Sequence, residues 1–129
     1  MKRVITSLVL CALCLTAFAQ SATFTVHNMS ERSLTVKIMK YDGGLYSTIY
    51  VPAKSSRTTN IFTQGYYYTK TKAEKQWSET LYSKDDAFFV QNNSQGYSVL
   101  TVTYWVEESK YPQSSGKRIS RLEFENDNK

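Results

Sequence analysis

The side chains of this 129-residue chain that are best suited to chemistry are aromatic and basic. Tyr66, Tyr68, Lys70 and Lys72 stand at every second position, and a strand turns such side chains toward one face. Tyrosine and tryptophan rings offer flat apolar area with a polar tip, which suits stacking on sugars and anchoring of protein interfaces. Neighbouring lysines add donors for acidic ligands. We therefore expect a ligand-binding surface, with Lys70 and Lys72 facing water.

Two further strand-like segments, 45–51 and 97–106, carry aromatic residues opposite their apolar, core-facing positions. The complete set of candidate ligand-binding residues is Tyr46, Tyr50, Tyr66, Tyr68, Lys70, Lys72, Tyr97 and Trp105. The hypothesis requires these strands to share one sheet. The alternative is a purely structural role, because cross-strand aromatic pairs stabilise exposed sheet faces by roughly 0.2–1 kcal/mol each.

Catalytic and metal-binding side chains are scarce after the first 19 residues. His27 is the only histidine, and it is expected on the polar face of the first strand. The acidic pairs Asp85-Asp86 and Glu107-Glu108 are direct neighbours, and neighbours in a strand point to opposite faces. Asp85-Asp86 in a turn leaves a weak calcium site as an alternative. We expect no enzyme activity, no metal and no cofactor, with a small hydrolase as the least favoured class.

The first 19 residues predict a secretory signal peptide. A basic Met1-Lys2-Arg3 precedes an apolar run, and Ala17-Phe18-Ala19 provides small residues for cleavage before Gln20. The run is shorter than the roughly 20 apolar residues of a membrane span. Cys11 and Cys14 both lie in this leader, so the processed domain has no thiol. The pattern favours an exported bacterial protein, periplasmic or secreted, without disulfides.

The remaining residues predict one domain over 20–125, with 126–129 frayed. Two of the 16 Lys and Arg lie in the leader, and the other 14 against 11 Asp and Glu leave a formal charge of +3. The basic residues are scattered, so nucleic acid is not an expected partner. No later stretch is apolar enough to span a bilayer.

The composition and alternation predict an all-β protein of about eight strands. We expect them at 23–27, 33–41, 45–51, 57–63, 66–73, 88–90, 97–106 and 118–125. Segment 72–82 fits either a short helix, with Ala73, Trp77 and Leu81 spaced by four, or a strand end followed by a short strand at 78–82; we favour strands. The expected architecture is an antiparallel two-sheet sandwich, and the alternative is a small β-barrel.

Val51-Pro52-Ala53 is followed by a polar loop, a predicted strand and then Gly65-Tyr66-Tyr67. This pattern lies within segments 43–48, 51–56, 65–73 and 96–101. In this pattern the chain resembles small exported bacterial immunoglobulin-like β-sandwich proteins. The resemblance implies architecture and no catalytic residue.

Two hypotheses for function follow. The first is an exported, non-enzymatic binding or adhesion-type module that contacts a cell-envelope or extracellular glycan or protein through its aromatic face. The second is a structural or assembly protein of the cell envelope that acts through edge-strand pairing, with the weak strand 57–63 as the expected edge.

Overall fold

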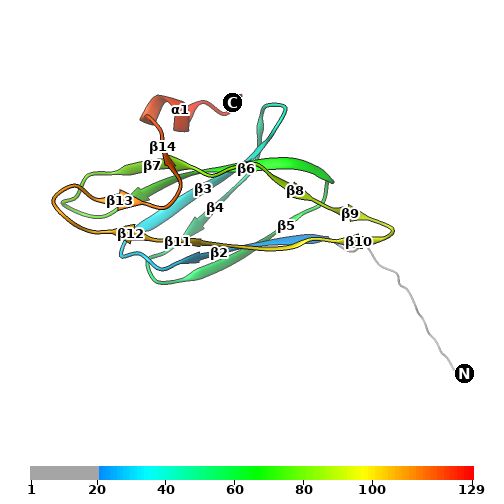
Figure 1. The fold of residues 1–129 in the computed structure, drawn as a ribbon, viewed down its shortest axis with the longest axis horizontal. Coiled ribbons are helices and arrows are strands. Elements are labelled where there is room, and N and C mark those ends of the chain that lie inside the picture. Colours follow the sequence, from blue (N-terminus) through cyan, green and yellow to red (C-terminus); the bar gives the residue numbers. More distant parts are fainter. Residues whose placement is uncertain (1–20) are drawn as a thin grey trace, which may run out of the picture.

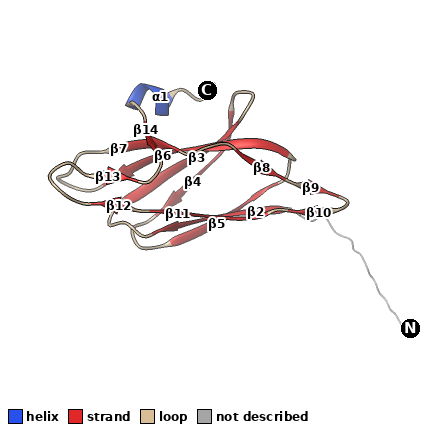
Figure 2. Cartoon of the chain, viewed as in Figure 1, coloured by secondary structure: helices blue, strands red, loops and turns tan. Residues whose placement is uncertain are grey.

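The computed structural model describes residues 21–129, so the predicted signal peptide and both cysteines lie outside the described part of the chain. The all-β prediction is confirmed. Within residues 21–129 the chain forms thirteen strands and one short helix. Figures 1 and 2 show the strands in two layers, with the helix on the outer side of one layer. The molecule is therefore a β-sandwich.

The larger sheet has the strand order β14-β7-β6-β3-β4, and β8 pairs with β6 beyond the end of β7. All of these pairs are antiparallel. The strands are β3 (Ser33–Lys40), β4 (Leu45–Val51), β6 (Gly65–Glu74), β7 (Leu81–Lys84), β8 (Phe88–Val90) and β14 (Lys117–Arg118). The long central strand β6 contacts three other strands of this sheet, so its side chains determine the character of both faces.

The smaller sheet has the order β11-β2-β5, with β11 at Val99–Tyr104, β2 at Ala22–Asn28 and β5 at Ser56–Ile61. β2 and β5 are antiparallel, whereas β2 and β11 are parallel. The expectation of antiparallel pairing throughout is wrong for this pair, because β11 returns beside β2 after the chain has crossed the other layer. Two short pairs extend the layers: β9 (Asn92–Asn93) with β10 (Gly96–Tyr97), and β12 (Val106–Glu107) with β13 (Gln113–Ser114).

The core lies between the two layers and follows the predicted alternation. β2 contributes Phe24 and Val26, and Phe24 stacks on Phe88 of β8 with ring centroids 5.4 Å apart. β3 contributes Leu34, Val36 and Ile38 in the same way. Each such burial stabilises the fold by about 1.5–3 kcal/mol.

Segment 72–82 is not a helix. β6 continues to Glu74, a turn follows, and the next strand is β7 at Leu81–Lys84 rather than the predicted 78–82. Strand pairing with β3 and β7 uses the backbone hydrogen-bonding groups of β6, which a helix would remove from the sheet.

The C-terminal strand is shorter than predicted. The predicted strand 118–125 is limited to the two residues of β14, and α1 (Arg121–Glu125) follows. Ser120 is its N-cap, and its hydroxyl accepts a hydrogen bond from the Glu123 amide at 3.1 Å. Ser120 and Glu123 have capping-box spacing, a helix signal that outweighs the β-rich context. In the segment predicted to fray, residues 126–129, the main-chain oxygens of Asn126 and Lys129 accept hydrogen bonds from Lys70 Nζ.

Candidate functional site

The eight candidate residues do not form one surface. Tyr66, Tyr68, Lys70 and Lys72 lie on the outer face of the larger sheet, and Tyr50 lies on the same sheet at its edge strand β4. Tyr97 belongs to β10 and Trp105 directly follows β11, so these two residues lie away from the β6 group. The requirement that all the strands share one sheet is therefore not met.

Tyr46 is an inward-facing residue, contrary to the prediction. Ile38 pairs with Ser47 and Met39 pairs with Leu45, so Tyr46 is the extra residue of a β-bulge. Its ring packs edge-on against the ring of Tyr67, with centroids 5.4 Å apart, and its hydroxyl accepts a hydrogen bond from the Phe62 amide at 2.9 Å. The bulge breaks the alternation that the sequence argument relied on.

Three exposed rings meet at one end of the larger sheet, and we call Tyr41, Tyr66 and Phe89 the aromatic surface. Tyr66 and Phe89 are cross-strand partners whose ring centroids lie 5.0 Å apart, and Tyr41 lies 6.3 Å from Tyr66. Their exposed fractions are 67% for Tyr41, 59% for Tyr66 and 44% for Phe89. Sequence reasoning missed Tyr41 and Phe89, because strand pairing brings both rings to Tyr66: β8 brings Phe89, and the end of β3 brings Tyr41, whose amide donates to the Tyr66 main-chain oxygen.

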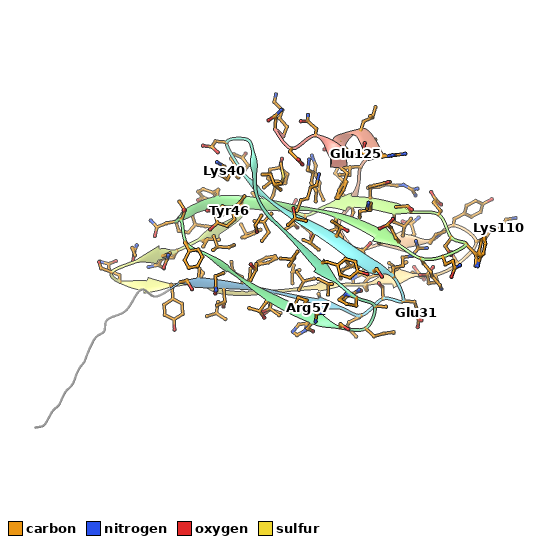
Figure 3. All side chains as sticks on the ribbon, turned by 180° about the vertical axis from the view of Figure 1, so that it is seen from behind. Glu31, Lys40, Tyr46, Arg57, Lys110 and Glu125 are labelled. Carbon is orange, nitrogen blue, oxygen red and sulfur yellow. The ribbon has the colours of Figure 1, made fainter. Side chains whose placement is uncertain are left out.

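Two hollows flank the aromatic surface. One has a volume of about 290 Å³ and is lined by residues 40–42 and 63–67. The other has a volume of about 340 Å³ and is lined by Tyr41, Tyr68 and residues 84–87. Figure 3 shows Lys40, which borders the first hollow, on the same outer side as Glu125 of α1. Aromatic walls with a few polar groups are typical of small-ligand sites.

The polar groups of these hollows have mixed charge. Lys40, Asp42 and Gln64 border the first hollow, and the second is bordered by Lys84, Asp85 and Asp86. Burial raises the pKa of Asp85 above the ordinary carboxyl value, and a hydrogen bond from the Thr69 hydroxyl opposes the rise. Both hollows therefore offer hydrogen-bond donors and acceptors beside apolar rings.

Four lysines face one another across four neighbouring strands, and we call Lys37, Lys70, Lys84 and Lys117 the lysine row. Lys70 lies directly opposite Lys37 on one side and Lys84 on the other, and Lys84 lies opposite Lys117. Like charges in directly opposed positions destabilise a sheet. The row therefore needs compensation from another part of the chain.

The C-terminal segment, residues 120–129, supplies that compensation. Lys70 Nζ donates to the main-chain oxygens of Glu123 at 2.7 Å and of Asn126 and Lys129 at 2.6 Å each. Lys70 is fully buried, so the prediction that it faces water is wrong. Burial lowers its pKa below the ordinary lysine value, and the neighbouring Lys37 charge lowers it further.

Other lysines of this face contact the same segment. Lys37 Nζ donates to the main-chain oxygen of Phe124 at 3.1 Å and to the Asp127 carboxylate at 2.6 Å. Lys84 Nζ donates to the Glu123 carboxylate at 2.8 Å, a bond that raises the pKa of Lys84. Lys72 is half-buried, with Nζ 5.9 Å from the centre of the Phe124 ring. Lys70 and Lys72 are thus on the predicted face, but beneath a cover that sequence reasoning did not foresee.

The loops at the far end of the sandwich converge on a buried arginine. Arg32 donates to both carboxylate oxygens of Glu108, at 3.0 and 3.1 Å, and to the main-chain oxygen of Glu79 at 2.5 Å. The ion pair lowers the pKa of Glu108. Figure 3 shows Lys110 at this end, with Glu31 on the same side. Trp77, in the loop after β6, is 93% exposed at a φ of 64°, a rare conformation for a bulky residue.

No protein-family model and no curated protein matches this sequence. Within residues 21–129 the chain has no helix that is long and apolar enough to cross a membrane. The function is therefore argued from the residues and their geometry.

Proposed function

We propose that this protein is an exported, non-enzymatic binding module whose aromatic surface binds a glycan. The observation that carries the proposal is the convergence of three exposed rings from β6, β8 and the end of the β3 strand between two hollows. The proposed export rests on the N-terminal leader. The sandwich architecture supports the proposed likeness to immunoglobulin-like modules.

The arrangement of the rings favours a bound ligand over a structural role alone. A structural cross-strand pair needs only Tyr66 and Phe89, whereas Tyr41 adds a third, largely exposed ring at an angle of 58° to Tyr66. Exposed apolar clusters of this kind are found at binding sites more than elsewhere on a surface.

The neighbouring polar groups favour a sugar. A pyranose ring presents C–H groups on its faces and hydroxyl groups around its edge. The faces can stack on Tyr66 or Tyr41, and the hydroxyls can reach the amide of Gln64 and the carboxylate of Asp42 beside them. The aromatic rings thus suit the C–H faces of a sugar, and the amide and carboxylate groups suit its hydroxyls.

Alanine substitution in the aromatic surface tests the proposal. We expect Tyr66→Ala to weaken binding of the best ligand on a glycan array about tenfold, because aromatic contacts of this kind contribute about 0.5–1.5 kcal/mol beyond the area they bury. The matched controls are Tyr97→Ala and Trp105→Ala, whose rings are 46% and 48% exposed outside this surface. Equal affinity of folded Tyr66→Ala and wild type, measured by calorimetry, would contradict the proposal.

Edge-strand assembly is the second candidate function. β5 pairs only with β2 in the three-stranded sheet, so its other edge is free for pairing within the described part of the chain. An exposed edge can accept a strand of a partner. Sedimentation of the protein at rising concentration tests this candidate: a strict monomer that gains no partner in envelope extracts would count against it.

A further inference from the structure

One face of β6 changes character along its length. Tyr66, Tyr68, Lys70 and Lys72 all point to the outer side of the larger sheet, about 6.6 Å apart in succession. The tyrosines line the hollows of the aromatic surface, whereas Lys70 and Lys72 lie under the C-terminal segment. A linear ligand that stacks on the tyrosines and continues along β6 would meet that segment next.

The C-terminal segment presents oxygen atoms to the lysine row. Lys70 uses all three donors of its ammonium group on main-chain oxygens, and Lys37 and Lys84 each contact a carboxylate. A chain of acidic sugars likewise offers oxygen atoms that accept hydrogen bonds, in its hydroxyl and carboxylate groups. The lysine row is thus already arranged for an oxygen-rich anionic chain.

The contacts that hold the C-terminal segment are of a kind that another anion can replace. Phe124 is the one buried apolar side chain among residues 120–129, all of which the structure describes. Most of its other contacts with the sheet are ion pairs and hydrogen bonds of lysine, and dissolved ions weaken the partly exposed ones, Lys37–Asp127 and Lys84–Glu123.

The C-terminal segment also borders the aromatic surface. The main-chain oxygen of Asn128 accepts a hydrogen bond from the Gly44 amide at 3.2 Å, in the hairpin that follows Tyr41. Lys84, which pairs with Glu123, lines the hollow that Tyr41 and Tyr68 share. A ligand in this hollow therefore reaches the segment directly.

We propose that β6 is a binding track for a linear polyuronate. Tyr66 and Tyr68 stack on its sugar rings, Lys70 and Lys72 bind its carboxylates, and residues 120–129 cover the lysines until such a chain displaces them. The proposal rests on the glycan-binding function above and adds the ligand class and its regulation. Charge complementarity selects an acidic chain, because the covered half of the track is cationic.

The experiment compares hexagalacturonate with its methyl ester, which has the same sugar rings without charge. Phe124→Ala should loosen the C-terminal segment and tighten binding of hexagalacturonate about tenfold. The reason is that the ligand no longer has to displace a docked segment to reach the lysines. The ester should bind with unchanged affinity. The matched control is Leu122→Ala, which removes an exposed apolar side chain from the same helix and should change neither affinity.

Two further measurements test the role of Lys72 and the release of the C-terminal segment. Adding Lys72→Gln to Phe124→Ala should reduce the gain for hexagalacturonate, because Lys70 alone then binds its carboxylates. Saturating hexagalacturonate should speed amide hydrogen exchange in residues 120–129 of the wild type. If Phe124→Ala does not fold, the pair Glu123→Gln and Asp127→Asn loosens the segment without creating a cavity and should give the same gain.

The outcomes separate the two proposals. If the ester binds in a Tyr66-dependent way but loosening the segment does not tighten hexagalacturonate, this inference is overturned and the proposed function stands. If neither sugar nor any other glycan binds through Tyr66, both are overturned. If Phe124→Ala tightens the binding of poly-L-glutamate as much as that of hexagalacturonate, the protein recognises charge alone and the polyuronate assignment is overturned.

Discussion

The outer faces of the two sheets differ in how their polar side chains find hydrogen-bond and ion-pair partners. On the smaller sheet the outward side chains are mainly hydroxyls that bond to one another across strands: Thr25 and Thr58 lie 2.7 Å apart, and His27 and Ser56 share a hydrogen bond of 2.5 Å. Thr101 and Thr103 of β11 lie on the same face and are exposed. Hydroxyl groups hydrogen-bond to one another and to water, so this face needs no cover.

At the centre of the larger sheet the lysine row points outward, and the ion-pair partners of Lys37 and Lys84 lie outside the sheet, in the C-terminal segment. Lys70 lies between Lys37 and Lys84, so its hydrogen-bond partners come from residues 53 to 59 positions further along the chain. The cover buries Lys70 and costs desolvation, which the lowered pKa of Lys70 reflects. A sheet face with charges of one sign therefore needs a covering segment, whereas a face of hydroxyl groups does not.

The largest expected effect comes from removing the ammonium group at the centre of the covered face. Lys70→Met should lower the free energy of unfolding by about 3 kcal/mol, because three main-chain oxygens lose their charged donor. Urea unfolding monitored by circular dichroism measures the change. Equal or greater stability would indicate that relief of lysine repulsion exceeds the loss of these bonds.

A double-mutant cycle sharpens the result. Phe124→Ala releases the same C-terminal segment, so its effect and that of Lys70→Met should not add. We expect the double variant to lie within about 0.5 kcal/mol of the less stable single variant. Additive effects would mean that the two side chains stabilise independent parts of the fold.

An intermediate and pH-dependent effect is expected at the rim of the covered face. The side chains of the Lys84–Glu123 pair are partly exposed, so Lys84→Gln should cost less than about 1 kcal/mol at neutral pH. The folded-state pKa of Lys84 is raised, so its contribution is fully present below the ordinary lysine value of 10.5 and is lost as pH rises through the raised pKa.

The measurement is the stability difference between wild type and Lys84→Gln in urea from pH 8 to the highest pH at which the protein folds. The difference should shrink above pH 10.5. A difference that stays constant would show that packing of the Lys84 stem, rather than its charge, is what contributes.

The smallest effect is expected on the open face. Thr25→Ala removes one exposed hydroxyl bond to Thr58, and water can replace that partner, so the cost should be a few tenths of a kcal/mol. The same urea experiment applies, and the cost should not change with pH, because neither hydroxyl of this pair ionises. A cost comparable to that of Lys70→Met would remove the contrast between the two faces.

Much of the fold could be predicted because strand alternation is a local property. The inward positions of Phe24, Val26 and Leu34 follow from a two-residue period, and so does the common face of Tyr66 and Lys70. The same rule failed at Tyr46, where one bulged residue changes which side chains face inward. The helix after Ser120 was also present as a capping-box signal, which the β-rich composition obscured.

The candidate site could be predicted only in part, because its remaining features depend on contacts between distant segments. Local alternation was enough to predict the strand character of this chain and the common outer face of Tyr66, Tyr68, Lys70 and Lys72. Tertiary structure alone decided that β8 brings Phe89 to Tyr66 and that the last ten residues cover Lys70. The physical reason is that alternation specifies which way a side chain points, whereas its exposure depends on which distant segment packs above it.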